Sequence, residues 1–270
     1  MRNAIRQWSH TQSWRALGQR LRAPARLPAR PLFGRVATPA AVAFGGMLVI
    51  ALMALADPAS LHILPEWPHV VVRLARIVTY LGDSGLYLVP LGVALVLLAV
   101  VDLELPPRLD AALRQLWLQL AFAFVAIAGT GLAVNVIKRA IGRVRPLHIE
   151  AGASWSFEPF SWRAANASFP SGHATTAWTV IAVVILLCGP RWRPWLFALG
   201  GLVCLSRVIL GAHYPADVVA GALFGWFATF WFADFLGRRG LVFRQNHDGA
   251  LALRGQDAAK TLIEAWRARR

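Results

Sequence analysis

The sequence is poor in charged residues and in cysteine. Only 15% of its 270 residues are Asp, Glu, Lys or Arg, whereas 57% are hydrophobic, which excludes an ordinary soluble domain. The two cysteines, Cys188 and Cys204, both fall within apolar runs. We therefore interpret them as small buried side chains and not as a disulfide or a metal site.

Acidic residues are also scarce. The chain has 13 Asp and Glu against 28 Lys and Arg, a net charge of +15, and Lys138 and Lys260 are its only lysines. No set of carboxylates, histidines or cysteines is spaced for a metal, so we expect neither a metal nor another cofactor. In a soluble protein this charge would indicate a nucleic acid partner. In a chain this apolar it indicates cytoplasmic tails beside anionic lipid, and no nucleic acid.

Six apolar runs have the character of membrane spans, each of which needs about 20 residues. They cover residues 36–56, 86–101, 116–137, 174–188, 195–210 and 216–236. The sequence therefore predicts an all-α integral membrane protein, with six transmembrane helices in one helical-bundle domain over residues 36–236. Asp57-Pro58 should end the first span, and residues 102–114 should be a polar connection. Residues 70–81 should form a helix lying in the membrane interface.

Basic tails flank this domain. Residues 1–35 carry arginines throughout and no acid, and residues 237–270 are also basic. The first tail has too long a basic region for a secretory signal peptide, and no clear cleavage site follows the first span. A mitochondrial transit peptide would share its composition. Trp8, Trp14 and Leu17 give a weakly amphipathic pattern that is compatible with an interfacial helix.

An even number of spans places both tails on one side of the membrane. The tails and the basic turn at 191–193 make that side cytoplasmic by the positive-inside rule, which suits a bacterial inner membrane. The loop 102–114 is net acidic and does not support this orientation. The ends of the third and fifth spans and the starts of the fourth and sixth then face the outer side. There they bring together three polar segments, at residues 138–146, 170–173 and 206–217.

Several polar residues in these segments also have a purely structural explanation. Lys138 could snorkel at a helix end, and Arg145 could be a surface charge. His213 and Asp217 lie four residues apart at a helix start and could be a satisfied polar pair. Arg207 is harder to explain, because an unpaired guanidinium within an apolar run costs about 2.5–3.5 kcal/mol.

Together, these residues form a set suited to phosphoryl transfer. The transition state spreads negative charge over equatorial oxygens, which fixed cations can hold in place of Mg²⁺. The three cations that can do so are Lys138, Arg145 and Arg207. A neutral His213, oriented by Asp217, can attack phosphorus and form a phosphohistidine. His173 can protonate the leaving oxygen and then activate water.

Two neighbouring segments belong to the same outer end of the bundle. The loop at 147–169 carries four aromatic residues typical of a membrane-interface belt: Trp155, Phe157, Phe160 and Trp162. Asp83 and Ser84, directly before the second span, are interpreted as a helix N-cap, and a place at the rim of a site is the alternative.

The three polar segments resemble, in order, the three-part signature of the type 2 phosphatidic acid phosphatase family, which is related to vanadium haloperoxidases and bacterial acid phosphatases. They read Lys-x6-Arg-Pro (Lys138–Pro146), Pro-Ser-Gly-His (Pro170–His173) and Ser-Arg-x5-His-x3-Asp (Ser206–Asp217). The resemblance implies a metal-independent lipid phosphate phosphatase with the roles given above. It also implies phosphate contacts from Ser171, Gly172 and Ser206, although Ser206 could instead be a helix-packing residue.

We therefore expect a membrane phosphatase for a lipid phosphate or diphosphate whose head group reaches the outer face. Undecaprenyl diphosphate, phosphatidic acid, phosphatidylglycerophosphate and a lipid A phosphate are the candidate substrates, because the signature recognises phosphate and not the lipid. One alternative is a lipid phosphotransferase, in which another hydroxyl replaces water. The other is a non-enzymatic transporter or anion-binding membrane protein. The sequence does not predict the oligomeric state.

Overall fold

The computed structural model describes residues 18–19, 21–22, 39–63, 67–100, 106–149, 155–245, 251–255 and 257–267. Its main helices are α2 (Pro39–Ile63), α3 (His69–Val78), α4 (Gly85–Val100), α5 (Pro107–Ile141), α6 (Gly172–Cys188), α7 (Arg193–Ile209), α8 (Pro215–Arg238) and α9 (Ala258–Arg267). Short 3-10 helices are η2 (Thr79–Gly82), η3 (Pro146–His148), η4 (Ala164–Asn166) and η5 (Pro190–Trp192), and the strands are β1 (Phe243–Gln245) and β2 (Leu251–Leu253). The all-α class is confirmed. Nearly all of the predicted 1–35 tail lies outside the described residues.

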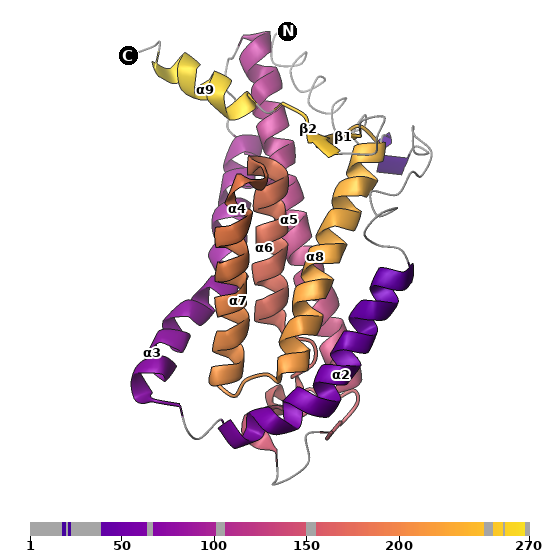
Figure 1. The fold of residues 1–270 in the computed structure, drawn as a ribbon. Helices are drawn as coiled ribbons and strands as arrows, with labels where there is room; N and C mark the ends of the chain where they lie inside the picture. Colours follow the sequence, from indigo (N-terminus) through magenta and orange to yellow (C-terminus); the bar gives the residue numbers. More distant parts are fainter. Residues whose placement is uncertain are drawn as a thin grey trace.

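The long helices run alternately up and down (Figure 1). Helices α5 and α7 end at the same end of the bundle at which α6 and α8 begin, while the β-hairpin and α9 lie at the opposite end (Figure 1). The bundle therefore gathers the three polar segments at one end, as the sequence predicts.

The predicted count of six spans is not exact. Among the described residues, four helical segments are long and apolar enough to cross a membrane: Ala41–His62, His69–Val100, Pro107–Ile141 and Pro215–Arg238. Helix α6 is a shorter apolar helix of 17 residues, and α7 has the same length. The second candidate span joins α3 to α4, so the interfacial position expected for residues 70–81 stays a prediction.

Two predicted boundaries are wrong. Helix α2 continues through Pro58 to Ile63, although the sequence predicts that the first span ends at Asp57. The Ser60 hydroxyl donates to the Asp57 carbonyl oxygen (2.7 Å), and the Asp57 carboxylate is buried and paired, so neither group ends the helix. Helix α5 begins at Pro107, inside the expected connection, with an Asp110–Arg114 ion pair (2.6 Å) in its first turns.

Helices α6 and α8 form the centre of the bundle and pack at very short range. A Cβ added to Gly221 would lie 2.4 Å from the Ser171 carbonyl oxygen, and one added to Gly225 would lie 2.4 Å from the Thr175 carbonyl oxygen. The Thr175 hydroxyl also donates to the Gly221 carbonyl oxygen across this contact (3.1 Å). The two glycines therefore fix the separation of α6 and α8, and with it the distance between the polar segments at their starts.

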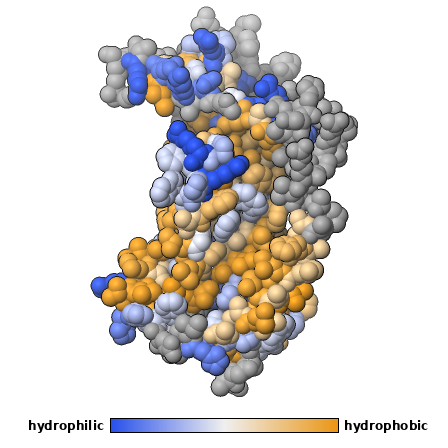
Figure 2. Space-filling view, in the orientation of Figure 1, coloured by the Kyte–Doolittle hydropathy of each residue, from blue (hydrophilic) through white to orange (hydrophobic). Residues whose placement is uncertain are grey.

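Much of the helix surface is hydrophobic and exposed. Figure 2 shows hydrophobic residues over most of the lower part of the visible face, with hydrophilic residues gathered over α9 at the top. Helices α2 and α4 expose large apolar side chains such as Phe44, Met47, Val89 and Val96, which suits contact with lipid. The interpretation of the cysteines as buried is wrong: Cys188 is exposed and Cys204 is only partly buried, and both are free thiols.

Residues after α8 pack back onto the bundle. Strands β1 and β2 pair antiparallel, and Phe243 is fully buried with its ring edge against Phe122 of α5. The Gln119 side chain of α5 donates to the Arg254 carbonyl oxygen (2.9 Å). The segment that composition describes only as a basic tail therefore closes the end of the bundle remote from the polar segments.

Candidate active site

The end of α5 supplies the first polar segment. Gly142 caps the helix in the left-handed conformation (φ 66°) and turns the chain, which leaves Lys138 in the last turn. Arg145 follows in extended conformation, and its backbone N–H donates to the Ala165 carbonyl oxygen (2.8 Å). The next turn is tied to the end of α7, since the Leu147 N–H donates to the Gly211 carbonyl oxygen (3.3 Å).

The start of α6 supplies the second segment. Ser171 is the N-cap, and its Oγ accepts from the Ala174 N–H (3.5 Å). Gly172 lies beside Lys138, because a Cβ added to it would be 3.2 Å from the Lys138 Nζ. The first N–H groups of a helix lack partners within that helix, so this end can receive an anion next to the Lys138 ammonium.

Helix η2 packs directly against His173. A Cβ added to Gly82 would lie 2.8 Å from the His173 Cβ. Asp83 follows, and its Oδ1 accepts from the Gly85 N–H (2.8 Å) at the start of α4. The capping role expected for Asp83 is confirmed, and its carboxylate also interacts electrostatically with His173.

The end of α7 supplies Ser206 and Arg207, both buried. The Ser206 hydroxyl donates to the Val203 carbonyl oxygen one turn earlier (2.7 Å), so its proton is engaged within its own helix. Arg207 is 8% exposed, and its Nη1 donates to the Thr79 hydroxyl of η2 (2.7 Å). The guanidinium is thus held between α7 and the segment that covers His173.

His213 lies in the turn between α7 and α8 and is buried. Its Nδ1 is 2.7 Å from the Ser168 carbonyl oxygen, which can only accept, so Nδ1 carries the proton and Nε2 of the neutral ring is unprotonated. Asp217 Oδ2 is near, as the sequence predicts, but is 3.8 Å from the same nitrogen. Burial lowers the pKa of His213 to about 4, because the charged ring is poorly solvated there, and Arg207 and Arg145 act in the same direction.

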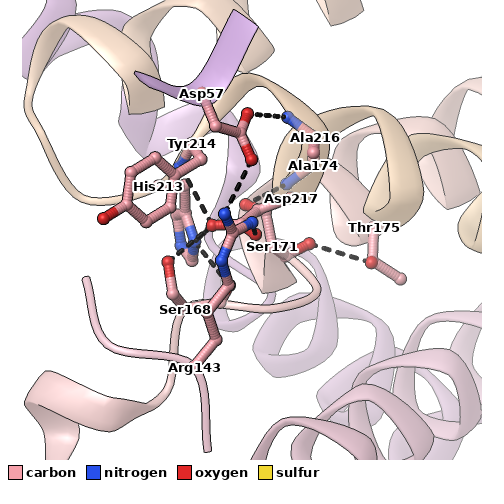
Figure 3. A network of polar contacts seen from close by, with 10 residues as sticks. All are labelled: Asp57, Arg143, Ser168, Ser171, Ala174, Thr175, His213, Tyr214, Ala216 and Asp217. Carbon is pink, nitrogen blue, oxygen red and sulfur yellow. Dashed lines mark hydrogen bonds and ion pairs between the residues drawn. The ribbon is translucent and has the colours of Figure 1, made fainter. Parts of the chain in front are cut away.

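Asp217 is fully buried and fully hydrogen-bonded (Figure 3). Its Oδ2 accepts from the Ser168 hydroxyl (2.5 Å) and from the Tyr214 N–H (2.9 Å). Its Oδ1 accepts from Arg143 Nη1 (2.6 Å). The carboxylate therefore braces both Ser168 and the first turn of α8, where Pro215 is the first residue.

Arg143 and the three predicted phosphate ligands differ in their partners. Arg143 is fully buried between the Asp57 and Asp217 carboxylates. The other three cations form no ion pair with a carboxylate within the described part of the chain: Lys138, Arg145 and Arg207. The Nε atoms of Arg145 and Arg207 are buried without a protein partner there. The three cations lie close enough to repel one another, and Arg207 also interacts electrostatically with both His173 and His213.

Sequence reasoning missed four residues of this site. They are Asp57, Thr79, Arg143 and Ser168. Arg143 lies inside the first polar segment but received no role, and Asp57 was interpreted as a helix end. Only Asp57 had a signal in the sequence, because a carboxylate next to a long apolar run is costly unless it has a partner.

Comparisons with known proteins show the family to which the chain belongs. Residues 119–241 match the model of the PAP2 superfamily. The lipid A 1-phosphatase of Rhizobium etli is 37% identical over 186 residues, covering 68% of this chain and 79% of that protein. The chain belongs to the PAP2 superfamily.

Other phosphatases are similar over shorter or more divergent alignments. The undecaprenyl-diphosphatase of Sulfolobus acidocaldarius is 34% identical over 43% of this chain and 53% of that protein. A crystal structure of a transmembrane PAP2 type phosphatidylglycerolphosphate phosphatase from Bacillus subtilis has a TM-score of 0.47 at 21% identity, over 72% of this chain and 94% of that one.

The PAP2 match contains all three polar segments, whereas Asp57 of α2 and Thr79 of η2 lie before it. The apolar helices and the PAP2 relatives identify the chain as an integral membrane protein with lipid phosphatase activity.

Proposed function

We propose that this PAP2 protein hydrolyses a lipid phosphate through a phosphohistidine formed on His213. The observation that carries the proposal is a neutral, buried imidazole next to three cations that have no carboxylate partner in the described residues. A nucleophile needs its Nε2 lone pair free, and the Nδ1–H bond to the Ser168 carbonyl oxygen leaves it so.

The cations provide the binding step. Lys138, Arg145 and Arg207 neutralise the phosphoryl oxygens, and their charge stabilises the transition state more than the substrate because the transferring oxygens are held in place. The N-terminus of α6, with Ser171 and Gly172, gives backbone and side-chain contacts on the other side. Ser206 contributes from α7, although its proton is donated to Val203 here.

The chemistry then takes two steps. His213 Nε2 forms a bond to phosphorus while the bond from phosphorus to the leaving lipid oxygen breaks, and His173 gives that oxygen a proton. Water next attacks the phosphohistidine, His173 accepts its proton, and the N–P bond breaks to release phosphate. Asp217 keeps Ser168 and the start of α8 in place throughout.

The residues at this end favour chemistry without a metal. Across the described ranges, no group of three or more His, Cys, Asp or Glu side chains is arranged to hold a metal ion. The three cations supply the charge that Mg²⁺ provides in other phosphoryl transfer sites.

We propose a lipid A 1-phosphate as the first substrate to test, with the site at the outer face of a bacterial inner membrane. Of the comparisons above, the lipid A 1-phosphatase combines the highest identity with coverage of most of both chains. The exposed aromatic residues Phe160 and Trp162 near the site suit a membrane interface, which is where a lipid head group lies.

Phosphate release by the purified protein in detergent tests this function. The panel contains lipid A, undecaprenyl diphosphate, phosphatidic acid and phosphatidylglycerophosphate, with His213→Ala as the matched control. We expect release from at least lipid A by the wild-type protein and none by the variant. Release only from another lipid of the panel would overturn the substrate assignment, and release from none would overturn the phosphatase proposal.

A further inference from the structure

We propose that Asp57 is a positioning residue for catalysis, acting through Arg143 on Asp217 and on the nucleophile His213. The inference rests on the role proposed above for His213. Asp57 lies in α2, outside the region that matches the superfamily model. Asp57 is therefore not part of the three signature segments, all of which lie within the matched region.

Asp57, Arg143 and Asp217 form a buried ion-pair network, with Arg143 between the two carboxylates (Figure 3). The Asp57 Oδ2 accepts from Arg143 Nη2 (2.7 Å), while Arg143 Nη1 donates to Asp217 Oδ1 (2.6 Å). All three side chains are fully buried, with 0% exposure. A buried guanidinium needs both carboxylates, because each buried charge is costly when a partner is lost.

A second hydrogen bond connects Asp57 with the first turn of α8, which carries Asp217. The Asp57 Oδ1 accepts from the Ala216 N–H (2.9 Å) in the first turn of α8. A carboxylate is favoured at a helix N-terminus, so Asp57 also holds the turn that carries Asp217. Asp217 in turn accepts from Ser168, whose carbonyl oxygen accepts from His213 Nδ1. Asp57 therefore supports Asp217 in two ways, through Arg143 and through the Ala216 N–H, and Asp217 in turn holds Ser168, which fixes the tautomer and orientation of His213.

A purely structural anchor would make the same contacts but would have a different consequence. If Asp57 only docked α2 on α8, its loss would lower the amount of folded protein and leave the turnover of each folded molecule unchanged. If it positions Asp217 and His213, its loss lowers kcat of the folded enzyme. Substrate binding by the three phosphate-site cations does not depend on it, so KM changes little.

The first experiment uses Asp57→Asn, which keeps the shape and an acceptor oxygen for Ala216 but removes the charge opposite Arg143. Rates are normalised to the monodisperse fraction in detergent. We expect kcat to fall about 10–100-fold, as for other residues that orient a site from outside it. The matched control is Asp110→Asn, which removes an exposed carboxylate of α5 and should keep wild-type kcat. Wild-type kcat in folded Asp57→Asn would overturn the proposal.

A double-mutant cycle tests the route through Arg143. Asp57→Asn should add little to the loss of kcat caused by Arg143→Gln, because both substitutions remove the same Asp57–Arg143 ion pair. Fully multiplicative losses would contradict action through Arg143. If Asp57→Asn does not give monodisperse protein, Asp57→Glu replaces it, since the longer carboxylate keeps the charge and displaces Arg143. Wild-type kcat in folded Asp57→Glu would then overturn the proposal.

The rate of His213 phosphorylation separates this inference from the proposed function. Wild-type protein that forms no acid-labile phosphoryl label from a phosphate-labelled lipid would refute the phosphohistidine, whatever Asp57 does. Normal labelling of the wild-type protein with slowed labelling of Asp57→Asn supports the positioning role. Equal labelling rates in the two proteins would refute that role and leave the proposed function intact.

Discussion

The Nδ1–H of His213 donates a hydrogen bond to the carbonyl oxygen of Ser168 and not to the carboxylate of Asp217. The Asp217 carboxylate instead accepts a hydrogen bond from the Ser168 hydroxyl. Ser168 therefore connects His213 with Asp217, which the sequence analysis expects to be in direct contact. A carbonyl acceptor fixes the tautomer of a neutral ring, because it can only accept the Nδ1 proton. This arrangement suits an imidazole that acts as a nucleophile and leads to the following predictions.

His213→Ala should abolish turnover while the protein still folds. The substitution removes the atom that bonds to phosphorus, and loss of a catalytic nucleophile costs about 1,000-fold or more. Phosphate release and acid-labile labelling by a phosphate-labelled lipid measure the effect, and gel filtration in detergent checks the fold. Activity near the wild-type level in this variant would exclude the mechanism.

The stability of the protein should fall between pH 6.5 and pH 4 because of His213. Burial lowers the pKa of this side chain from 6.5 to about 4, so in this window the unfolded chain binds a proton that the folded chain does not. Stability therefore decreases as the pH falls through it, by up to about 3 kcal/mol for this group. Thermal unfolding in detergent at pH 7.5, 5.5 and 4.5 measures the slope. His213→Gln should have a shallower slope, and an unchanged one would contradict the assignment.

Thr79→Val should weaken binding of the phosphoryl group. The substitution keeps the branched shape but removes the acceptor of Arg207 Nη1, which then loses its fixed position. A hydrogen bond to a charged group accounts for about 10-fold in binding, and we expect the vanadate inhibition constant to rise by this factor. Thr130→Val, a buried substitution within α5, serves as the control. Equal vanadate inhibition in both variants would show that Thr79 does not position Arg207.

Activity should survive EDTA and should be inhibited by vanadate. Three cations carry the charge of the transferring group in the proposed mechanism, and trigonal-bipyramidal vanadate resembles that group. Phosphate release is measured before and after chelation, with added Mg²⁺ as a further arm. Loss of activity in EDTA that Mg²⁺ restores would mean that Lys138, Arg145 and Arg207 are not sufficient.

The site should face the outer side of the membrane and α9 the cytoplasm. In a variant without the two native cysteines, Trp162→Cys and Lys260→Cys place exposed thiols at the two ends of the bundle, since these side chains are 84% and 73% exposed. An impermeant maleimide should label the first in intact cells or spheroplasts and the second only after lysis. The reverse pattern would move the site to the cytoplasm and remove outer-leaflet lipids from the substrates.

The sequence alone determined the class and the ends of the helices that carry the site. Each signature segment is local, since Ser171 caps the helix that follows it and Pro215 begins the helix that carries Asp217. Alternation of the apolar runs then placed the segments at one end of the bundle. These features depend on neighbouring residues and on helix length, which a sequence pattern records directly.

Only the tertiary structure decided how the charges are paired. Arg143 and Asp57 are 86 positions apart, and no local pattern relates them. The same contact explains why α2 continues past Asp57-Pro58, because Arg143 and the Ala216 N–H satisfy a carboxylate that would otherwise end an apolar helix. Burial of these groups comes from the packing of α2 against α8. That packing distinguishes the arginine that holds the site together from the cations that remain available to a phosphate.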